Sequence, residues 1–328
     1  MRAKGIAYDT GFVRHGDISL EKFDLDEVRR DLTVIRNDLH CNAVHLVGGD
    51  PERLERAAEI AAELGLEIWF SPYPLELTPP EILALFTDCA RRAERVRLGG
   101  AEVVFVTGVE LSIMNSGFLP GDDVPQRLGR LLERPERMRE AGARLNAFLA
   151  EAVGVVRQHF RGKLTYACIP FENPDWTLFD VKSFELIRSA EVADVYASSI
   201  RNVVAQGMPV AITGFGTAAW RGSGAVAPRS MEIVEHDESG RAVRVKDGYV
   251  RDEEEQATYL REVLETFEAE GVDAAFVYMF ALAGYTHRPD EPERDLDMAG
   301  PGIVKVHEDG SWEPKAAFGA VAEVYARI

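Results

Sequence analysis

Short apolar segments alternate with longer amphipathic segments eight times along this sequence of 328 residues. The apolar segments are rich in Val, Ile, Phe and Tyr, which is typical of β-strands that are buried on both faces. We expect strands at residues 3–8, 43–47, 67–71, 102–107, 164–169, 180–184, 209–213 and 274–279. This regular alternation predicts an α/β fold with a parallel sheet.

The intervening segments carry apolar residues at the spacing that places them on one face of a helix. One of them begins with Pro51 after Asp50, a typical helix start, and it ends at Gly65. We expect helices at residues 24–40, 51–65, 79–100, 134–160, 192–206, 252–270 and 315–327. Only the link at residues 173–179 is too short for a full helix.

Eight strands that alternate with helices, without a polar linker, predict a single-domain (β/α)8 TIM barrel that spans residues 1–328. The alternative is an open, doubly wound sheet, which usually has a glycine-rich phosphate-binding turn after its first strand. Here the first strand leads into AYDTGFVRHG, which does not match GxGxxG. The closed barrel is therefore favoured.

Two long segments interrupt the alternation, one after the seventh strand at residues 214–250 and one after the eighth at residues 281–305. The first contains alternating residues that predict a hairpin turning at Ser239 and Gly240. In (β/α)8 barrels, the loops after the strands form the active-site face. We therefore expect both segments to cover a substrate.

The composition excludes several classes of partner. The net charge of −18 repels phosphate backbones and anionic lipids, so neither nucleic acid nor a membrane is expected as a partner. No segment approaches the ~18 apolar residues of a membrane span, and no signal-peptide pattern is present, so a cytoplasmic location is expected. The three cysteines have neither disulfide nor metal-binding spacing, and no cofactor is expected.

Acidic residues directly follow four of the expected strands: Asp9, Glu110, Glu172 and Glu185. Cleavage of a glycosidic bond needs one protonated carboxyl to assist the leaving oxygen. It also needs a second carboxylate that attacks the sugar or activates water. We therefore expect Glu110, Glu172 and Glu185 to be catalytic, with Glu110 and Glu172 as the pair on which the chemistry depends.

Aromatic side chains are expected at the same rim, where they can pack against sugar rings while polar side chains bind the hydroxyls. The predicted substrate-binding residues are Tyr8, Asp9, Trp69, Tyr73, Asn115, Trp176, Gly214, Trp220, Arg221, Tyr278, Tyr285 and His287. His287 is also able to gather with Asp295 and Asp297 around a metal ion. Hard cations prefer six or more oxygens at defined spacing, however, so no metal site is expected.

With these residues in view, the chain resembles the clan of (β/α)8-barrel retaining glycoside hydrolases, whose two catalytic glutamates follow the fourth and seventh strands. Within that clan it most resembles the actinobacterial glycosidase-like proteins often labelled abortive infection proteins. The resemblance covers nearly the whole chain. It rests on VELSIMNSGFLPG, PFENPDWTLFDV and ITGFGTAAWRG.

The resemblance implies that Glu110 is the acid/base, although Val109 replaces the asparagine that usually precedes this glutamate. At the seventh strand, relatives carry a glutamate as nucleophile, whereas this chain has Gly214, which has no side chain with which to attack. Natural divergence and a deliberate removal of the nucleophile both fit this difference. The neighbouring residues 217–220 also depart from the family pattern, which favours divergence.

Three functions remain open at this point. The first is an enzyme acting on a glycoside or another sugar-containing small molecule, with Glu110 as acid and Glu172 or Glu185 as base or nucleophile. The second is a repurposed barrel enzyme of specialised metabolism, such as a lyase, cyclase or isomerase, in which these carboxyls move protons. The third is a non-catalytic pseudoenzyme that binds sugar. We expect the first.

Overall fold

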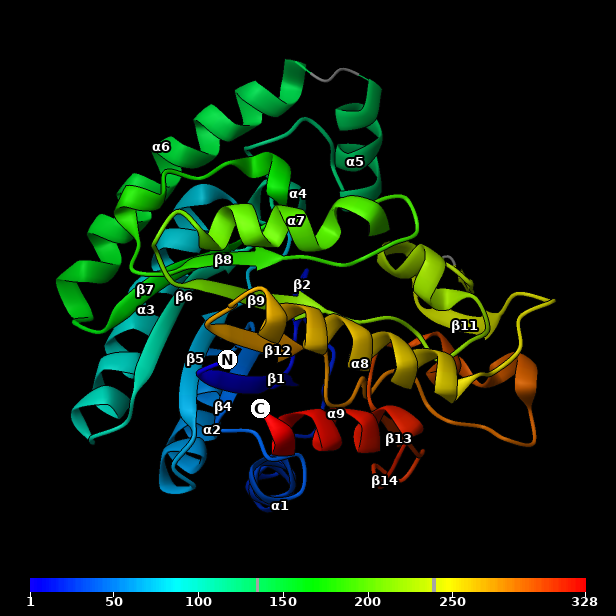
Figure 1. The fold of residues 1–328 in the computed structure, drawn as a ribbon. Helices are drawn as coiled ribbons and strands as arrows, with labels where there is room; N and C mark the ends of the chain where they lie inside the picture. Colours follow the sequence, from blue (N-terminus) through cyan, green and yellow to red (C-terminus); the bar gives the residue numbers. More distant parts are fainter. Residues whose placement is uncertain (134–135, 238–239) are drawn as a thin grey trace.

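The computed structural model describes residues 1–133, 136–237 and 240–328. Eight parallel strands close into a barrel in which each strand lies next to its predecessor in the chain (Figure 1). In chain order they are β1 (Ala3–Asp9), β4 (Ala43–Gly48), β5 (Glu67–Pro72), β6 (Val103–Val109), β7 (Lys163–Cys168), β8 (Lys182–Glu185), β9 (Val210–Phe215) and β12 (Ala274–Val277). The predicted (β/α)8 barrel is confirmed, and every predicted strand overlaps an observed one.

Helices surround the barrel at the predicted places. They are α1 (Leu25–Asn37), α2 (Pro51–Glu63), α3 (Pro79–Leu98), α6 (Glu136–His159), α7 (Ala193–Val204), α8 (Glu253–Ala269) and α9 (Ala316–Arg327). Residues 134–135, at the start of the helix predicted at 134–160, lie outside the described residues. Side chains fix several helix starts: the Asp50 carboxylate accepts a hydrogen bond from the Glu52 N–H at 2.8 Å, next to Pro51 in the first turn of α2.

Several short elements were not predicted. The link after β6 contains α4 (Leu111–Met114) and α5 (Val124–Glu133), and the link after β1 contains the hairpin of β2 (Val13–Arg14) and β3 (Asp17–Ile18). His15 and Gly16 form the turn of this hairpin, with φ of 52° and 88°, as a two-residue type I′ turn requires. The short link predicted at residues 173–179 contains only the 3-10 turn η2 (Trp176–Leu178).

Apolar side chains pack in two layers, because successive residues of a strand point to opposite faces of the barrel wall. The larger layer lies between strands and helices and includes Ile6 and Tyr8 of β1. The smaller layer fills the barrel interior, where the rings of Trp69 and Phe276 lie 4.8 Å apart. The interior also contains polar side chains: the Thr165 and Ser183 hydroxyls lie 2.6 Å apart across β7 and β8.

The two long segments lie at one end of the barrel, to the right in Figure 1 (yellow and orange). The segment after β9 contains the predicted hairpin, formed by β10 (Val234–His236) and β11 (Ala242–Val245). Of the predicted turn, Ser239 lies outside the described residues and Gly240 donates its N–H to the Asp237 oxygen at 2.9 Å. The segment after β12 includes the 3-10 turns η4 (Pro292–Arg294) and η5 (Leu296–Ala299), and leads into β13 (Val304–Val306) and β14 (Trp312–Pro314).

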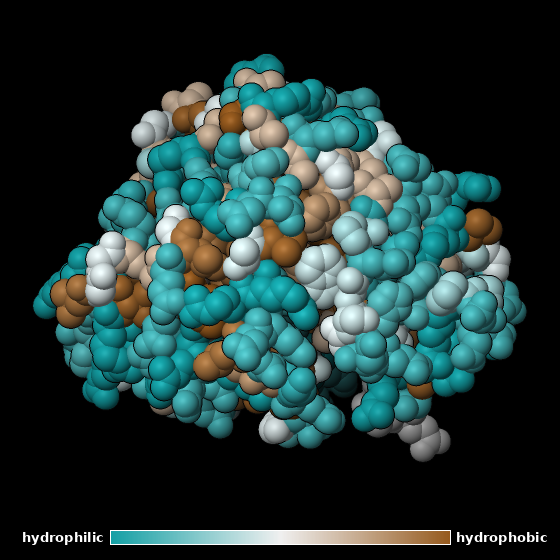
Figure 2. All heavy atoms as spheres, turned by 90° about the horizontal axis from the view of Figure 1, so that it is seen from below, coloured by the Kyte–Doolittle hydropathy of each residue, from teal (hydrophilic) through white to brown (hydrophobic). Residues whose placement is uncertain are grey.

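The face seen in Figure 2 is mostly hydrophilic, with hydrophobic side chains in separate patches. No helix in the described part of the chain is both long and apolar enough to cross a membrane.

Candidate active site

Two of the predicted carboxylates line one small cavity at the mouth of the barrel. Glu110 follows β6, Glu185 ends β8, and both face a cavity of about 220 Å³. Gly214 of β9 lines the same cavity, together with the rings of Tyr73 and Tyr278. Residues at the ends of five strands, β5, β6, β8, β9 and β12, or in the loops after them therefore converge here, as expected for the active-site face of this fold.

The backbone of Glu110 has an unusual conformation. Its φ is 45° and its ψ is 41°, in the left-handed region that residues with a Cβ adopt rarely. The register between β6 and β7 shifts between Val106 and Val109, and the Glu110 N–H then donates to the Ala167 oxygen at 2.9 Å. Such bulges redirect side chains at strand ends, and here the bulge precedes the residue that faces the cavity. Strained backbone of this kind is concentrated at functional sites.

The carboxylate of Glu185 occupies the space beside Gly214. Glu185 and Gly214 are register partners on neighbouring strands β8 and β9. A methyl group on Gly214 would lie 1.6 Å from Oε2 of Glu185, far inside contact distance. The Cα of Gly214 thus faces the cavity, and the place of its missing side chain is filled by a carboxylate from the adjacent strand.

One oxygen of this carboxylate lacks a partner. Oε1 of Glu185 is buried and has no hydrogen-bond partner in residues 1–133, 136–237 and 240–328. Buried polar atoms in folded proteins are nearly always hydrogen-bonded, so the described residues leave the Glu185 carboxylate only partly satisfied.

His45 of β4 supports the same strand from across the barrel interior. Its Nδ1 lies 3.2 Å from the backbone oxygen of Thr213, the residue before Gly214. Because a carbonyl only accepts, Nδ1 must carry the proton. Burial lowers the pKa of His45 to about 4, so the ring is neutral near pH 7.

Glu172 has a different environment from that of Glu185. It is 1% exposed, and its carboxylate accepts hydrogen bonds from the Ser112 N–H (3.1 Å) and hydroxyl (2.6 Å). It also accepts from the Tyr166 hydroxyl at 2.9 Å and the Ile169 N–H at 3.2 Å. The Tyr166 oxygen in turn accepts from the Leu111 N–H at 2.8 Å. Glu172 therefore fixes the turn that follows Glu110.

This placement corrects the predicted pairing of Glu110 with Glu172. Glu172 lies behind the turn of α4 and is not among the side chains that line the cavity. Glu110 and Glu185, which remain partly accessible, share the cavity instead. Glu172 lies on the 3-10 turn η1 (Pro170–Glu172) after β7, where backbone N–H groups hold its carboxylate, so its catalytic role stays a prediction that this position does not favour.

Burial raises the pKa of the three glutamates Glu110, Glu172 and Glu185. The pKa of Glu185 rises to about 7 by burial, opposed by the Thr213 hydroxyl, and that of Glu172 rises to about 7 by burial, opposed by its hydrogen-bond donors. The pKa of Glu110 rises well above its usual range, first by burial and then by the charges of Glu185 and Glu172. A raised pKa favours the protonated form of Glu110, which is the form that can donate a proton.

A larger cleft of about 650 Å³ adjoins the small cavity. The two share Tyr73, Met114 and Tyr278. The β2–β3 hairpin forms one wall, where the Phe12 ring packs edge-on against Tyr73 with ring centroids 5.0 Å apart. The binding of Tyr73 and Tyr278 to a substrate remains a prediction, and their position is compatible with it.

The structure places Tyr8 and Asp9 at a different cavity from the one that Glu110 and Glu185 line. The Tyr8 hydroxyl donates to Oδ2 of Asp31 on α1 at 3.1 Å, because Tyr8 points outward from β1. Asp9 accepts the Gly11 N–H at 2.7 Å, and burial raises its pKa to about 7. Both line a separate cavity of about 180 Å³ at the edge of the barrel.

Three more predicted binding residues are structural. Trp69 is 0% exposed inside the barrel, and its Nε1 donates to Glu67 at the start of β5 at 2.9 Å. Asn115 is also 0% exposed, with its Nδ2 donating to the Pro74 oxygen at 3.0 Å. Trp176 packs against Phe184 on the outer face of β8, with ring centroids 5.3 Å apart. Each is held in the core or a loop and not at the rim.

Three predicted binding residues belong to the long segments. The Trp220 indole N–H donates to the Ser230 oxygen at 2.8 Å, within a small apolar cluster that also holds Tyr285. Arg221 is exposed, and its Nε lies 3.5 Å from Asp252. None of the three is among the residues that line the cavity of Glu110 and Glu185, and their binding to a substrate stays a prediction.

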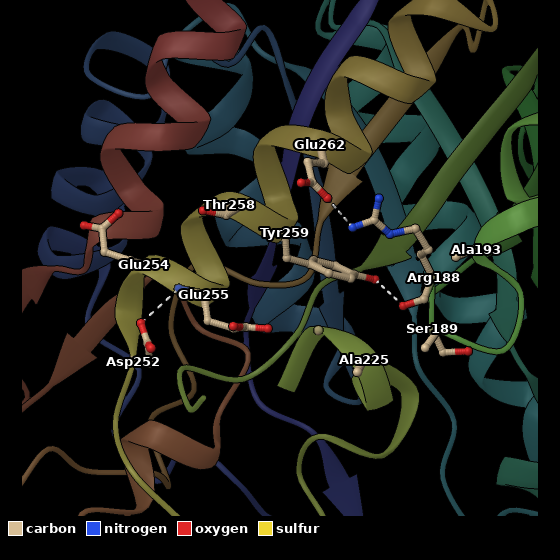
Figure 3. A pocket seen from close by; sticks show the side chains of 12 residues that line it. Arg188, Ser189, Ala193, Ala225, Asp252, Glu254, Glu255, Thr258, Tyr259 and Glu262 are labelled. Carbon is tan, nitrogen blue, oxygen red and sulfur yellow. Dashed lines mark hydrogen bonds and ion pairs between the residues drawn. The ribbon is translucent and has the colours of Figure 1, made fainter. Parts of the chain in front are cut away.

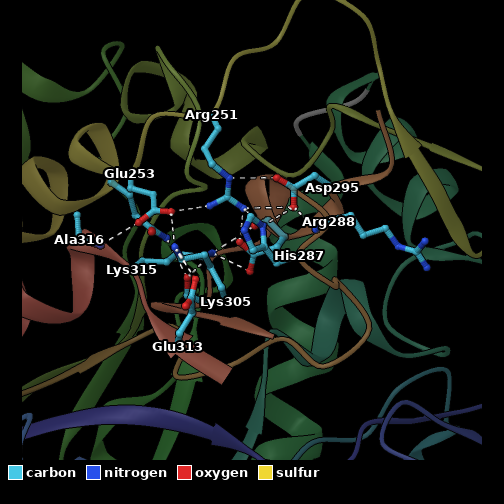
Figure 4. Close-up of polar contacts among 12 residues, drawn as sticks. Arg251, Glu253, His287, Arg288, Asp295, Lys305, Glu313, Lys315 and Ala316 are labelled. Atoms are coloured by element: carbon cyan, nitrogen blue, oxygen red, sulfur yellow. Dashed lines mark hydrogen bonds and ion pairs between the residues drawn. The ribbon is translucent and has the colours of Figure 1, made fainter. Parts of the chain in front are cut away.

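His287 gathers with Asp295 and Asp297, as expected for a possible metal site, but cations of the protein occupy this cluster (Figure 4). The Arg251 guanidinium lies 3.1 Å from Asp295 and 2.6 Å from Asp297. The buried ammonium of Lys315 lies 3.0 Å from the other oxygen of Asp297. These ion pairs join the segment after β12 to α9 and satisfy the carboxylates without a metal.

A cavity of about 640 Å³ lies on the outside of the barrel, against α8 (Figure 3). Arg188 pairs there with Glu262 at 2.6 Å, and the Tyr259 hydroxyl donates to the Arg188 oxygen at 2.9 Å. Figure 3 shows acidic side chains such as Glu255 around it. It contains none of the carboxyls with raised pKa values, so we do not identify it as the active site.

Several lining residues escaped the sequence analysis. They are Met114 on α4 and Ile187 after β8, with Arg229, Met231 and Glu232 from the segment after β9. The prediction that residues 214–250 cover the site included the last three only as a segment. The positions of these three residues depend on how the segment folds over the barrel. The alternation of strands and helices in the sequence does not predict that.

No protein-family model matches this chain, and no curated protein matches its sequence. Several solved structures do resemble the structure of this chain. A GH113 beta-1,4-mannanase aligns over 100% of both chains with 14% identity and a TM-score of 0.62. The GH113 beta-mannanase AaManA from Alicyclobacillus acidocaldarius, in complex with ManMIm, aligns over 99% of this chain and 97% of its own with 14% identity and a TM-score of 0.61.

A family 1 b-glucosidase from Thermotoga maritima also aligns over 99% of this chain and 97% of its own, with 13% identity and a TM-score of 0.61. At such identities the similarity describes the backbone and not the site. The chain therefore has the (β/α)8-barrel fold found in these glycoside hydrolases.

Proposed function

We propose that this protein is a glycoside-hydrolase-like enzyme that acts on a glycoside or another sugar-containing small molecule through Glu110 and Glu185. One observation carries the proposal: the Glu185 carboxylate fills the space beside Gly214, in a cavity that Glu110 also lines. A carboxylate from β8 thus takes the place of the glutamate that related barrels carry on β9.

The two carboxyls have environments suited to different roles. Glu110, whose raised pKa favours the protonated form, donates its proton to the leaving oxygen. Glu185, when ionised, attacks the anomeric carbon or activates a water molecule through its carboxylate, which lines the cavity. Carboxyl groups ~5–5.5 Å apart permit direct attack with retention, whereas ~6.5–9.5 Å leaves room for water and gives inversion. Tyr73 and Tyr278 supply rings against which a sugar packs.

A second candidate is a repurposed enzyme that moves protons, such as an isomerase or lyase. The pKa of about 7 for Glu185 favours it, because such a group exchanges a proton readily near neutral pH but is half protonated as a nucleophile. Both candidates place the chemistry in the same cavity, and they differ in whether Glu185 forms a covalent bond.

The test begins with a panel of 2,4-dinitrophenyl glycosides of common hexoses, with release of dinitrophenolate as the readout. The hexose that is cleaved is then offered as its 2-deoxy-2-fluoro derivative. Attack by Glu185 would form an ester at the anomeric carbon and expel dinitrophenolate, and the slowed intermediate would add one fluoroglycosyl group to the protein mass. Peptide mapping by mass spectrometry should locate the group on Glu185.

Glu59→Gln is the matched control, because Glu59 is an exposed residue of α2 paired with Arg56 at 3.0 Å. The Glu59→Gln variant should cleave the substrate and become labelled as the wild type does. A label on another carboxylate would reject the role of Glu185. Turnover with inverted product and no label would assign Glu185 as a base, and no cleavage of any glycoside would leave the second candidate.

A further inference from the structure

The cleft beside the active site has a charge unlike that of the whole protein. It measures about 650 Å³, against about 220 Å³ for the cavity that holds Glu110 and Glu185. Because the two share Tyr73 and Tyr278, a molecule bound in the small cavity can extend directly into the cleft. The cleft is therefore the place for the part of a substrate beyond the reacting bond.

Most of the cleft wall is apolar. Phe12 and Ile18 of the first hairpin face Leu75 and Leu282 from the loops after β5 and β12. The Phe12 ring is fixed by its contact with Tyr73. Such a surface suits a flat or branched hydrophobic group better than a chain of sugar rings, which would need more hydrogen-bonding partners.

The charged residues among the described lining of the cleft are Arg14, Asp17 and Arg241. Cations thus outnumber anions here, in a protein whose net charge is −18. Arg14 lies on the β2–β3 hairpin and Arg241 borders the β10–β11 hairpin, so the two hairpins bring their guanidinium groups to one cleft from segments far apart in the sequence.

Among the residues that the structure describes, Arg14 has no ion-pair partner. Asp17 lies opposite it in the β2–β3 pair, yet no carboxylate in the described parts of the chain forms an ion pair with Arg14. Its charge opposes the rise in the pKa of Tyr73, which places the guanidinium near the junction of cleft and cavity. An arginine in this position is free to bind an anion with two parallel hydrogen bonds.

We propose, building on the proposed function, that the cleft binds a hydrophobic aglycone that carries a carboxylate, with Arg14 and Arg241 as its anion-binding residues. The sugar occupies the small cavity, the hydrophobic part packs on Phe12 and Tyr73, and the carboxylate reaches the arginines. The substrate is then an acidic glycoside of a small hydrophobic molecule and not a neutral polysaccharide.

The first experiment tests the cleft without any turnover. Binding of 2-naphthoate and of 2-naphthalenemethanol, which differ in charge but little in shape, is measured by isothermal titration calorimetry. The wild type should bind the naphthoate about tenfold more tightly, since charge-assisted hydrogen bonds are about twice as strong as neutral ones. Arg14→Gln and Arg241→Gln should each remove most of this preference, measured as the ratio of the affinities for the two probes.

Arg56→Gln, on the exposed face of α2, is the matched control and should keep the preference. About 0.5 M NaCl should weaken naphthoate binding and not that of the alcohol. Equal affinities of the wild type for both probes, or a preference that survives in both Arg14→Gln and Arg241→Gln, would overturn the proposal.

The second experiment uses the glycoside that the enzyme cleaves, prepared with a carboxylated aryl aglycone and with its methyl ester. The wild type should favour the acid in kcat/KM by about tenfold, mainly through KM, and Arg14→Gln should lose that preference while it still cleaves the ester. If naphthoate binding depends on Arg14 but no glycoside is cleaved, the anion site stands and the proposed function fails. If glycosides are cleaved equally well whether or not the aglycone is charged, the proposed function stands and the anion site fails.

Discussion

Glu172 and Glu185 lie near the ends of adjacent strands β7 and β8, and burial raises the pKa of each to about 7. Their partners differ. Glu172 accepts four hydrogen bonds from Ser112, Tyr166 and Ile169, whereas Oε1 of Glu185 has no partner within the described residues. Similarly raised pKa values thus accompany different numbers of hydrogen-bond partners.

The difference separates a carboxylate that holds the site from one that faces the substrate. A buried acceptor with four donors stabilises its loop and has no lone pair available for chemistry. A buried acceptor without a donor costs free energy that folding must supply from elsewhere. We infer that Glu185 is retained for its reactivity, and Glu172 for the position of the turn after Glu110. A raised pKa on its own does not distinguish the two.

The largest effect should come from Glu185→Gln. Because a general base or nucleophile contributes ~10²–10⁴-fold, we expect kcat/KM on the cleaved substrate to fall by that factor. Glu172→Gln should reduce it far less, since Glu172 acts only through the turn beside Glu110. Steady-state kinetics of both variants, with circular dichroism to confirm folding, measures the contrast. Equal losses in the two variants would remove the distinction between the carboxylates.

The free energy of unfolding should show the opposite order, with the larger loss in Glu172→Gln and the smaller in Glu185→Gln. Glu172→Gln places an amide NH2 against groups that donate hydrogen bonds, so buried donors lose their acceptor. We expect its free energy of unfolding to fall by about 2–4 kcal/mol, as several donors are affected at a cost of ~1–3 kcal/mol each. Glu185→Gln should change it by less, and urea unfolding compares the two. A stable Glu172→Gln would indicate that the four hydrogen bonds contribute little.

The fold was predictable because it depends on periodicity. Each run of β-forming residues is followed by a helical stripe, and this alternation has few closed solutions. The site residues depended on finer geometry. The alternation along a strand indicates which residues point into the barrel, but not how far along the barrel they lie. Trp69 points inward near the start of β5, beside Glu67, and therefore fills the core and does not reach the mouth.

The relation between Glu185 and Gly214 was not predictable for a related reason. It depends on the register between β8 and β9, which shifts between Phe184 and Glu185. A slip of one residue turns a side chain to the other face of the wall, and no sequence pattern here fixes that shift. The sequence did provide both halves of the relation, as an acid after the sixth strand and a glycine in the seventh.

Gly214→Ala tests that relation directly. The added methyl group would lie 1.6 Å from Oε2 of Glu185, so the carboxylate must move. We expect a destabilisation of about 1–3 kcal/mol, as for other overpacked sites, and a lower kcat. In a Glu185→Ala background the same change should cost much less stability, because the colliding atoms are gone, and a double-mutant cycle by urea unfolding measures this coupling.

The same cycle has a functional form. Gly214→Glu alone collides with Glu185, but combined with Glu185→Ala it returns a carboxylate to β9. The combined variant should recover part of the activity that Glu185→Ala loses. Additive stability effects in the alanine cycle would show that residues 185 and 214 do not compete for one space, and the comparison with Glu172 would then lose its basis.

The smallest effect concerns pH. The pKa of Glu185 is raised from 4.5 to about 7, so between these values the folded protein keeps a proton that the unfolded chain has released. The stability from this group is fully present below about pH 4.5 and is lost as the pH rises through about 7. Relative to Glu185→Gln, the wild type should therefore lose on the order of 1–2 kcal/mol between about pH 5 and pH 8 in urea unfolding. Glu172 titrates in both proteins, so its contribution largely cancels in the difference. A difference that stays flat would mean that Glu185 is already ionised in mildly acidic solution, which favours a nucleophile over a proton carrier and leaves its unpartnered oxygen as the feature that separates it from Glu172.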